Sequence, residues 1–245
     1  MKDMFCFQCQ QTAHNTGCEG KAGVCGKKAD TANYQDELIG ALIGLARAAK
    51  NGNVTEKTDT LVLKGLFTTI TNVNFNDTTI KKLKSEIEAE KGRINSEKFE
   101  DYDMKKLWEE HEDIRSLKSL ILFGIKGMAA YAYHALALGK TDSEVNKFFY
   151  EALFAIGENK SADELLALVL KTGEVNFKCM ALLDEANTES YGNPVPIEVP
   201  LTIEKGPFIV VSGHDLHDLK LLLEQTKDKG INIYTHSEML PAHGY

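Results

Sequence analysis

Four of the five cysteines in this 245-residue chain fall within one short stretch near its start. Residues 5–26 read FCFQCQQTAHNTGCEGKAGVCG, which spaces the cysteines as C-x2-C-x8-C-x6-C. The intervening residues are rich in Gly, Thr, Asn and Gln and show no apolar period, so we expect a loop. A loop that gathers the thiols of Cys6, Cys9, Cys18 and Cys25 predicts a metal centre.

Three chemistries could use these thiols. A disulfide framework needs an oxidising compartment, yet residues 1–4 lead into the cysteines with no apolar signal segment, which disfavours it. A structural zinc ion usually takes two C-x2-C pairs, and here only Cys6 and Cys9 have that form. An iron-sulfur cluster is larger than one ion, so its loop must reach further around it, as uneven gaps allow. The spacing therefore favours iron and sulfur, with zinc as the alternative.

The residues around the cysteines add a family resemblance. The segments MFCFQCQQTA, TGC and VCGK resemble the N-terminus of the hybrid cluster protein family, also called prismane proteins or hydroxylamine reductases. The resemblance implies that the four cysteines hold an iron-sulfur cluster close to the surface. Members with compact spacing, as here, carry a [4Fe-4S] cubane.

Size and charge exclude several classes of partner. A chain of this length forms one or two domains, and 43% hydrophobic residues suffice for a core. A net charge of -8 without a concentrated basic patch argues against nucleic acid and anionic membranes as partners. We expect no apolar run near the roughly 18 residues of a membrane span, and hence a soluble, cytoplasmic protein. The oligomeric state stays open.

The prolines divide the chain. All five lie in its last quarter, and the first 193 residues have none. Because proline disrupts helix interiors, its absence predicts a mainly α fold over residues 1–193, which also carry the cysteine loop. The prolines between 194 and 206 predict a linker, and residues 207–245 the beginning of an α/β domain.

Apolar periodicity places the helices of the first part. We expect helices at 35–50, from about 59, at 78–91 and at 112–139, then one that begins at the capping box Ser161-x-x-Glu164 and closes at Gly173, and a last one at 174–187. A weak internal repeat favours two three-helix bundles, which the family resemblance also implies. Cys179, at helical spacing from Val175 and Leu183, is expected to be a packed core thiol.

The last part predicts one strand-helix-strand unit, the start of a Rossmann-like domain. Strands are expected at 208–211 and 231–234 and a helix at 215–229, capped by Asp215. Two strands joined by a crossover helix run parallel. His214 and Glu238 then follow the carboxyl ends of the two strands, at the sheet edge where ligands bind in open α/β folds.

These two residues also belong to the resemblance. SGHDL at 212–216 and YTHSEMLPA at 234–242 resemble the segments that supply a histidine and a glutamate to the hybrid [4Fe-2O-2S] cluster of this family. Carried over, His214 and Glu238 are catalytic iron ligands. The family's other ligands to that cluster come from later in its chains, so we expect this chain to provide the first cluster and only two ligands of the second.

The leading hypothesis is an iron-sulfur oxidoreductase that reduces hydroxylamine to ammonia and water, or nitric oxide, with electrons from a donor protein through the cubane. The alternative is a non-catalytic electron-transfer or redox-sensing module built on the four-cysteine cluster. A third hypothesis, a zinc-stapled helical interaction domain, would be redox-silent.

Overall fold

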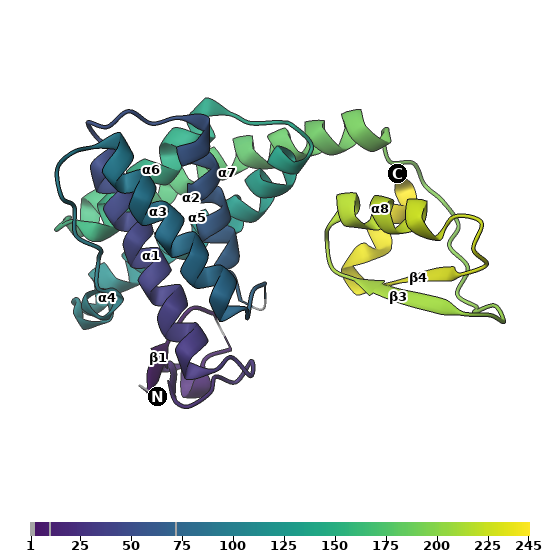
Figure 1. The fold of residues 1–245 in the computed structure, drawn as a ribbon, viewed down its shortest axis with the longest axis horizontal. Coiled ribbons are helices and arrows are strands. Elements are labelled where there is room, and N and C mark those ends of the chain that lie inside the picture. The colour runs from purple at the N-terminus through teal and green to yellow at the C-terminus, as the bar shows by residue number, and fades with distance from the viewer. Residues whose placement is uncertain (1–2, 10, 72) are drawn as a thin grey trace. The chain divides into compact units, whose positions relative to one another are not determined.

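The computed structural model describes residues 3–9, 11–71 and 73–245 (Figure 1). The chain is mainly helical, as the proline distribution predicted. It divides into two compact units. The first comprises Met1–Tyr133 and Asp142–Met180, and the second His134–Thr141 and Ala181–Tyr245.

The first unit is built around one helix. Helix α1 packs against β1, α2, α3, α4 and α6 and buries almost every apolar side chain that it carries. The helices are α1 (Ala29–Ala49), α2 (Glu56–Thr68), α3 (Asp77–Ile94), α4 (Met104–Glu109), α5 (Glu112–Ala137), α6 (Ser143–Gly157) and α7 (Ala162–Tyr191), and the ends of α5 and α7 belong to the second unit. The helices expected at 35–50, from about 59, at 78–91 and at 112–139 are present, but α1 begins earlier than its period predicted.

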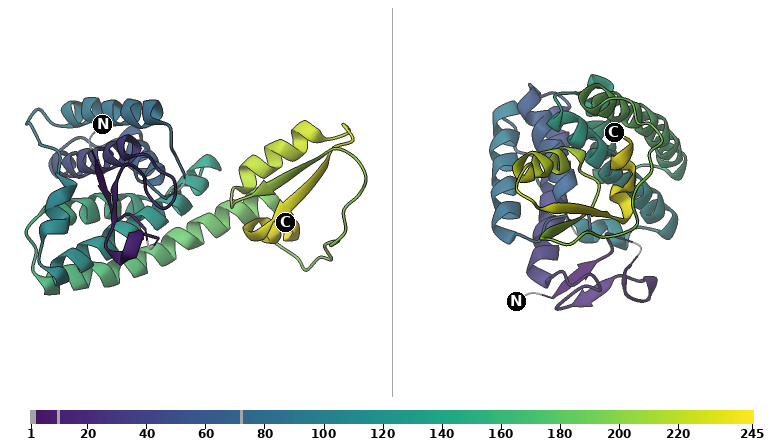
Figure 2. Two further views of the ribbon diagram at one scale, coloured as in Figure 1. Left: turned by 90° about the horizontal axis from the view of Figure 1, so that it is seen from below. Right: turned by 90° about the vertical axis from the view of Figure 1, so that its right-hand side faces the viewer.

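Helix α7 corrects one expectation. We predicted a break at Gly173, whereas the helix runs unbroken through it (Figure 2). Glycine in a helix costs only about 1 kcal/mol relative to alanine. The buried stripe continues past it through Val175 and Cys179, and this packing outweighs the local cost. The capping box at the helix start is present, since Ser161 and Glu164 exchange hydrogen bonds.

Helix α5 corrects the expectation that the chain has no apolar run as long as a membrane span. Its length and composition would suffice to cross a membrane, although no such apolar run was expected. A helix that packs inside a protein can be as apolar as a membrane span. Ile121, Leu122 and Ile125 are fully buried in the first unit, so α5 serves as a core helix.

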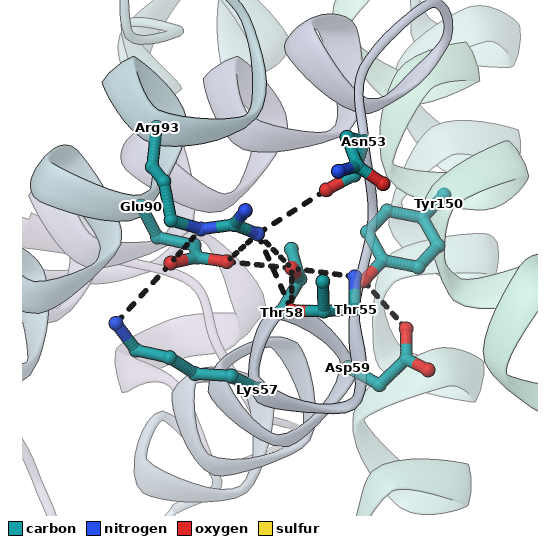
Figure 3. A network of polar contacts seen from close by, with 8 residues as sticks. All are labelled: Asn53, Thr55, Lys57, Thr58, Asp59, Glu90, Arg93 and Tyr150. Carbon is teal, nitrogen blue, oxygen red and sulfur yellow. Dashed lines mark hydrogen bonds and ion pairs between the residues drawn. The ribbon is translucent and has the colours of Figure 1, made fainter.

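One buried carboxylate joins α2 to α3 (Figure 3). Glu90 of α3 accepts hydrogen bonds from Arg93 at 2.6 and 3.0 Å and from the Thr58 hydroxyl at 2.6 Å, and Lys57 lies 3.3 Å away. Thr58 also caps the backbone N–H of Thr55 at the start of α2. The buried charge is therefore paired on both oxygens, and it fixes the two helices to each other.

The second unit contains the predicted strand-helix-strand. Strands β3 (Phe208–Ser212) and β4 (Asn232–His236) are parallel, with Ser212 opposite His236. Helix α8 (Leu216–Thr226) joins them and lies along one face of the pair, and the 3-10 segment η2 (Ser237–Gly244) follows β4 (Figure 2). Asp215 caps α8 as predicted, accepting from the N–H of Asp218 at 2.9 Å.

Candidate metal centre

The cysteine stretch begins with a small hairpin that the sequence did not reveal. Strands β1 (Met4–Cys6) and β2 (Cys18–Gly20) are antiparallel, and their pairing sets Cys6 directly opposite Cys18. Strands of three residues are too short to show an alternating period, which explains why we expected only a loop. Figure 1 shows β1 beside the first turns of α1, against which it packs.

An aromatic contact fixes the hairpin. The rings of Phe5 and Phe7 lie 4.8 and 4.9 Å from that of Trp108 in α4. Gly17 has a φ of +114° and sits so close to Phe5 that a Cβ atom would lie 2.5 Å from its ring. Glycine is therefore required here, immediately before Cys18.

The rest of the stretch folds back on itself to present Cys25. The N–H of Gly23 donates to the carbonyl of Lys27 at 2.8 Å, and that of Gly26 to the carbonyl of Gly23 at 2.9 Å. Gly26 has a φ of +82°, the left-handed conformation that glycine adopts readily. Helix α1 begins four residues after Cys25, so the turn is anchored on a rigid element.

The structure brings all four of these cysteines to one cavity, whose wall they line together with Gln8 and Lys27. Cys18 is buried and the other three are partly exposed, and all five cysteines of the chain are free thiols. Gly23 also lines the cavity, and a Cβ atom there would lie 3.6 Å from the sulfur of Cys25.

A buried cation lies in the same wall. Lys27 is only 3% exposed and lines the cavity. In the part of the chain that the structure describes, no hydrogen bond or ion pair joins its ammonium to another residue. A lysine side chain in the wall of a poorly solvated cavity attracts negative charge, so the site favours an anionic occupant. Four thiolates around iron and sulfide form such an anion, and the residues present therefore fit an iron-sulfur cluster.

Behind the wall lies a second charged group. Gln8, between the first two cysteines, donates from its amide to Asp36 at 2.9 Å and accepts from the Lys126 ammonium at 2.6 Å. Lys126 also donates to the carbonyl of Thr69 at 3.0 Å. Burial raises the pKa of Asp36 to about 7 and lowers the pKa of Lys126 to about 7. Each charge opposes the shift of the other, but removal from water outweighs this attraction.

These cations act on the thiols as well. Burial raises the pKa of the Cys6 thiol, while a backbone hydrogen bond from Gln8 and the charges on Lys27 and Lys126 oppose that shift. Sequence reasoning missed both lysines and Gln8. The only sequence signal for Lys126 is its position inside the apolar run LILFGIKGMAA. A lysine in such a run is rarely buried unless it is paired with another group.

His214 and Glu238 lie at one edge of the second unit. They follow β3 and β4 by two residues each, beyond the paired residues Ser212 and His236. The pKa of Glu238 is lowered by hydrogen bonds from its own N–H and the Ser237 hydroxyl, and to a lesser degree by His214 and His236. The two predicted ligands thus share the carboxyl edge of the sheet, where both side chains are exposed.

The remaining candidates are accounted for. Cys179 is fully buried, its thiol lies 3.4 Å from the carbonyl of Met128, and burial raises its pKa to about 12, so the prediction of a core thiol is confirmed. Among the described residues, no three His, Cys, Asp or Glu side chains are grouped as ligands of a single metal ion.

Comparison with known proteins gives one consistent result. Residues 4–245 match the model of the Prismane/CO dehydrogenase family. The chain is 46% identical to hydroxylamine reductases of Acetivibrio thermocellus, Solidesulfovibrio magneticus and Methanocaldococcus jannaschii. Each alignment covers 99% of this chain and 49 or 50% of the relative, so the chain spans about half the length of the curated relatives it matches. The chain belongs to the Prismane/CO dehydrogenase family.

Proposed function

We propose that this chain is the cluster-bearing front part of a hydroxylamine reductase. The observation that carries the proposal is the cavity lined by Cys6, Cys9, Cys18 and Cys25 together with the largely buried side chain of Lys27. The similarity to hydroxylamine reductases over 99% of the chain supports it.

In this proposal the four cysteines hold a [4Fe-4S] cubane. A bound cubane supplies one-electron transfer, which suits it to receive electrons from a donor protein. The chain's own residues set the conditions for that role. The hairpin holds Cys6 and Cys18 side by side, the turn before α1 holds Cys25, and the partial exposure of Cys6, Cys9 and Cys25 leaves one side of the site open to solvent.

His214 and Glu238 would contribute to the hybrid [4Fe-2O-2S] cluster. Imidazole and carboxylate are ligands suited to irons that carry oxygen bridges, whereas thiolates and sulfides suit the soft side of such a cluster. The reaction takes hydroxylamine, two electrons and two protons to ammonia and water. Nitric oxide is a second candidate substrate of the same chemistry, and a non-catalytic electron-transfer or redox-sensing module is the alternative.

The fold fits the same proposal. We infer that the helices of the first unit form two three-helix bundles, and that the parallel pair β3 and β4 with α8 begins a Rossmann-like domain. Exposed apolar residues on β3, among them Phe208 and Val210, are consistent with a sheet that continues in a longer protein.

The first test is iron and acid-labile sulfide per chain in anaerobically purified protein. About four of each is expected for one cubane. Zinc without iron would reject the proposal and support the zinc-stapled domain.

The second test uses a complete reductase that contains this chain. His214→Ala should abolish hydroxylamine reduction and leave the absorbance of the cubane unchanged, because only the second cluster loses a ligand. His217→Ala is the matched control, since His217 lies in the first turn of α8 and outside the proposed ligand set. Full activity of His214→Ala would exclude His214 as a ligand.

A further inference from the structure

Two neighbouring lysines differ sharply in their surroundings. Lys27 is 3% exposed and lines the cysteine cavity, whereas Lys28 is exposed, occupies the position before α1 and does not line the cavity. In the described residues Lys27 has no acidic partner within ion-pair distance. Because Lys27 lines the cavity and has no described carboxylate beside it, its charge is available to whatever occupies the cavity.

A second ammonium lies one layer behind the same wall. Lys126 is 4% exposed on the apolar helix α5, and both its hydrogen bonds go to neutral acceptors, Gln8 Oε1 and the carbonyl of Thr69. Gln8 lines the cavity, so Lys126 is separated from the cavity by one side chain. Among the residues that the structure describes, hydrogen bonds connect Lys126 to Asp36 only through the side-chain amide of Gln8.

We propose that Lys27 and Lys126 are the counter-cations of the group held by the four cysteines and that they raise its reduction potential. This inference rests on the proposed function, namely that the group is an iron-sulfur cluster. The charge of Lys27 attracts the cluster from the cavity wall. The charge of Lys126 attracts it from behind Gln8, where two hydrogen bonds hold the ammonium.

The physical reason is the change of charge on reduction. One electron from the reductant adds one negative charge to a cluster that is already anionic. A fixed cation in a poorly screened site attracts the reduced form more strongly than the oxidised form, so it favours reduction. The effect falls with distance, and Asp36 partly cancels the field of Lys126. We therefore expect Lys27 to contribute more than Lys126, whose pKa of about 7 also leaves it only partly protonated at neutral pH.

The experiment is a redox titration, followed by electron paramagnetic resonance, of anaerobically purified protein. Lys27→Met removes the charge and keeps most of the side-chain volume, and Lys28→Met is its control. Lys126→Met is compared with Lys118→Met, because Lys118 is equally buried on α5 but pairs with Glu110 at 2.8 Å and does not line the cavity. Iron and sulfide are measured for every variant.

We expect Lys27→Met to lower the equilibrium constant for reduction about tenfold, or about 59 mV for a one-electron couple. Lys126→Met should shift it in the same direction by less. The two control variants, Lys28→Met and Lys118→Met, should keep the reduction potential of wild type. Lys27→Arg, which keeps the charge, should also have that potential. An unchanged potential in Lys27→Met with full iron content would overturn the proposal.

Loss of the cluster is also informative. If Lys27→Met folds by circular dichroism but lacks iron, recovery of iron in Lys27→Arg supports a need for the charge, and failure of both variants refutes it. If the unaltered protein holds no iron, the proposed function itself fails, which the iron measurement reports separately.

Discussion

The first unit contains two networks of charged residues, and the pKa values of their charged groups are shifted in opposite ways: toward ionisation in one and toward the neutral form in the other. In the Glu90 network, hydrogen bonds from Arg93, Thr58 and Lys57 lower the pKa of the carboxyl to about 2, so it stays ionised (Figure 3). In the network of Lys126, Gln8 and Asp36, burial brings the pKa of both charged groups to about 7.

The difference comes from what touches the charged atoms. The Glu90 oxygens accept directly from a guanidinium and a hydroxyl, and such charge-assisted bonds offset the cost of burial. Lys126 and Asp36 are separated by a neutral amide, so their attraction is too weak to offset removal from water. A charge that is paired directly therefore stays ionised over a wide pH range, whereas a charge paired through a neutral amide changes its ionisation near pH 7.

The two networks also differ in location. None of the Glu90 partners lines the cysteine cavity, whereas Gln8 does. The Glu90 network therefore joins α2 to α3, whereas the Lys126 network lies beside the cysteine cavity. Under the proposal above, an incompletely paired ammonium keeps more of its field available to the occupant of the cavity.

The largest expected effect on stability comes from Glu90→Gln. Gln keeps the shape and one acceptor but loses the charge, so we expect a loss of about 2 kcal/mol in the free energy of unfolding. Urea denaturation followed by circular dichroism measures it. The control is Glu164→Gln, because hydrogen bonds with Lys160 and Ser161 also lower the pKa of Glu164 to about 2, but on the surface. An equal loss in both variants would show that burial does not matter.

The second prediction concerns pH. The pKa of Glu90 is about 2 in the folded protein and 4.5 ordinarily, so its stabilisation is present above pH 4.5 and is lost as the pH falls toward 2. Asp36 has the opposite shift, from 3.8 to about 7, so its ionisation penalises the folded state increasingly as the pH rises between these values. Hence the difference in unfolding free energy between wild type and Glu90→Gln should shrink in acid. The unfolding free energy of Asp36→Asn should rise relative to that of wild type as the pH increases toward 7.

Unfolding free energies from pH 2.5 to 8 measure both differences. Both variants are compared with wild type at each pH, so that loss of any bound metal in acid affects the three proteins alike. Differences that do not change with pH for either variant would contradict the two opposite shifts.

What the sequence could predict was local. The four cysteines lie within twenty residues, so one loop and hairpin can carry them to the same cavity. His214 and Glu238 follow two strands of one crossover unit, and the parallel pairing of that unit is a general rule. In both cases chain connectivity alone limits where the side chains can go.

What it could not predict was tertiary. Gln8 and Lys126 are 118 residues apart, and no period or spacing relates them. The early start of α1 has a similar cause, because the Thr31 hydroxyl bonds to Asp77 at the start of α3, at 2.6 Å. The unbroken course of α7 through Gly173 depends on buried contacts beyond the glycine.

The smallest effect tests whether the cationic partners of Glu90, rather than the burial of hydrogen bonds alone, explain the comparison. The Tyr150 hydroxyl donates to Asp59 at 2.7 Å in the same region, and burial raises the pKa of Tyr150 so that it stays protonated (Figure 3). Only one hydroxyl is lost, and Asp59 is partly exposed, so water can replace the missing donor. Tyr150→Phe should therefore cost about 1 kcal/mol of unfolding free energy, measured by urea denaturation. Tyr131→Phe, exposed on α5, is the control. If Tyr150→Phe cost as much as Glu90→Gln, the stability of the Glu90 network would follow from burial of hydrogen bonds in general. The contrast with Lys126 would then need another explanation than direct pairing of charges.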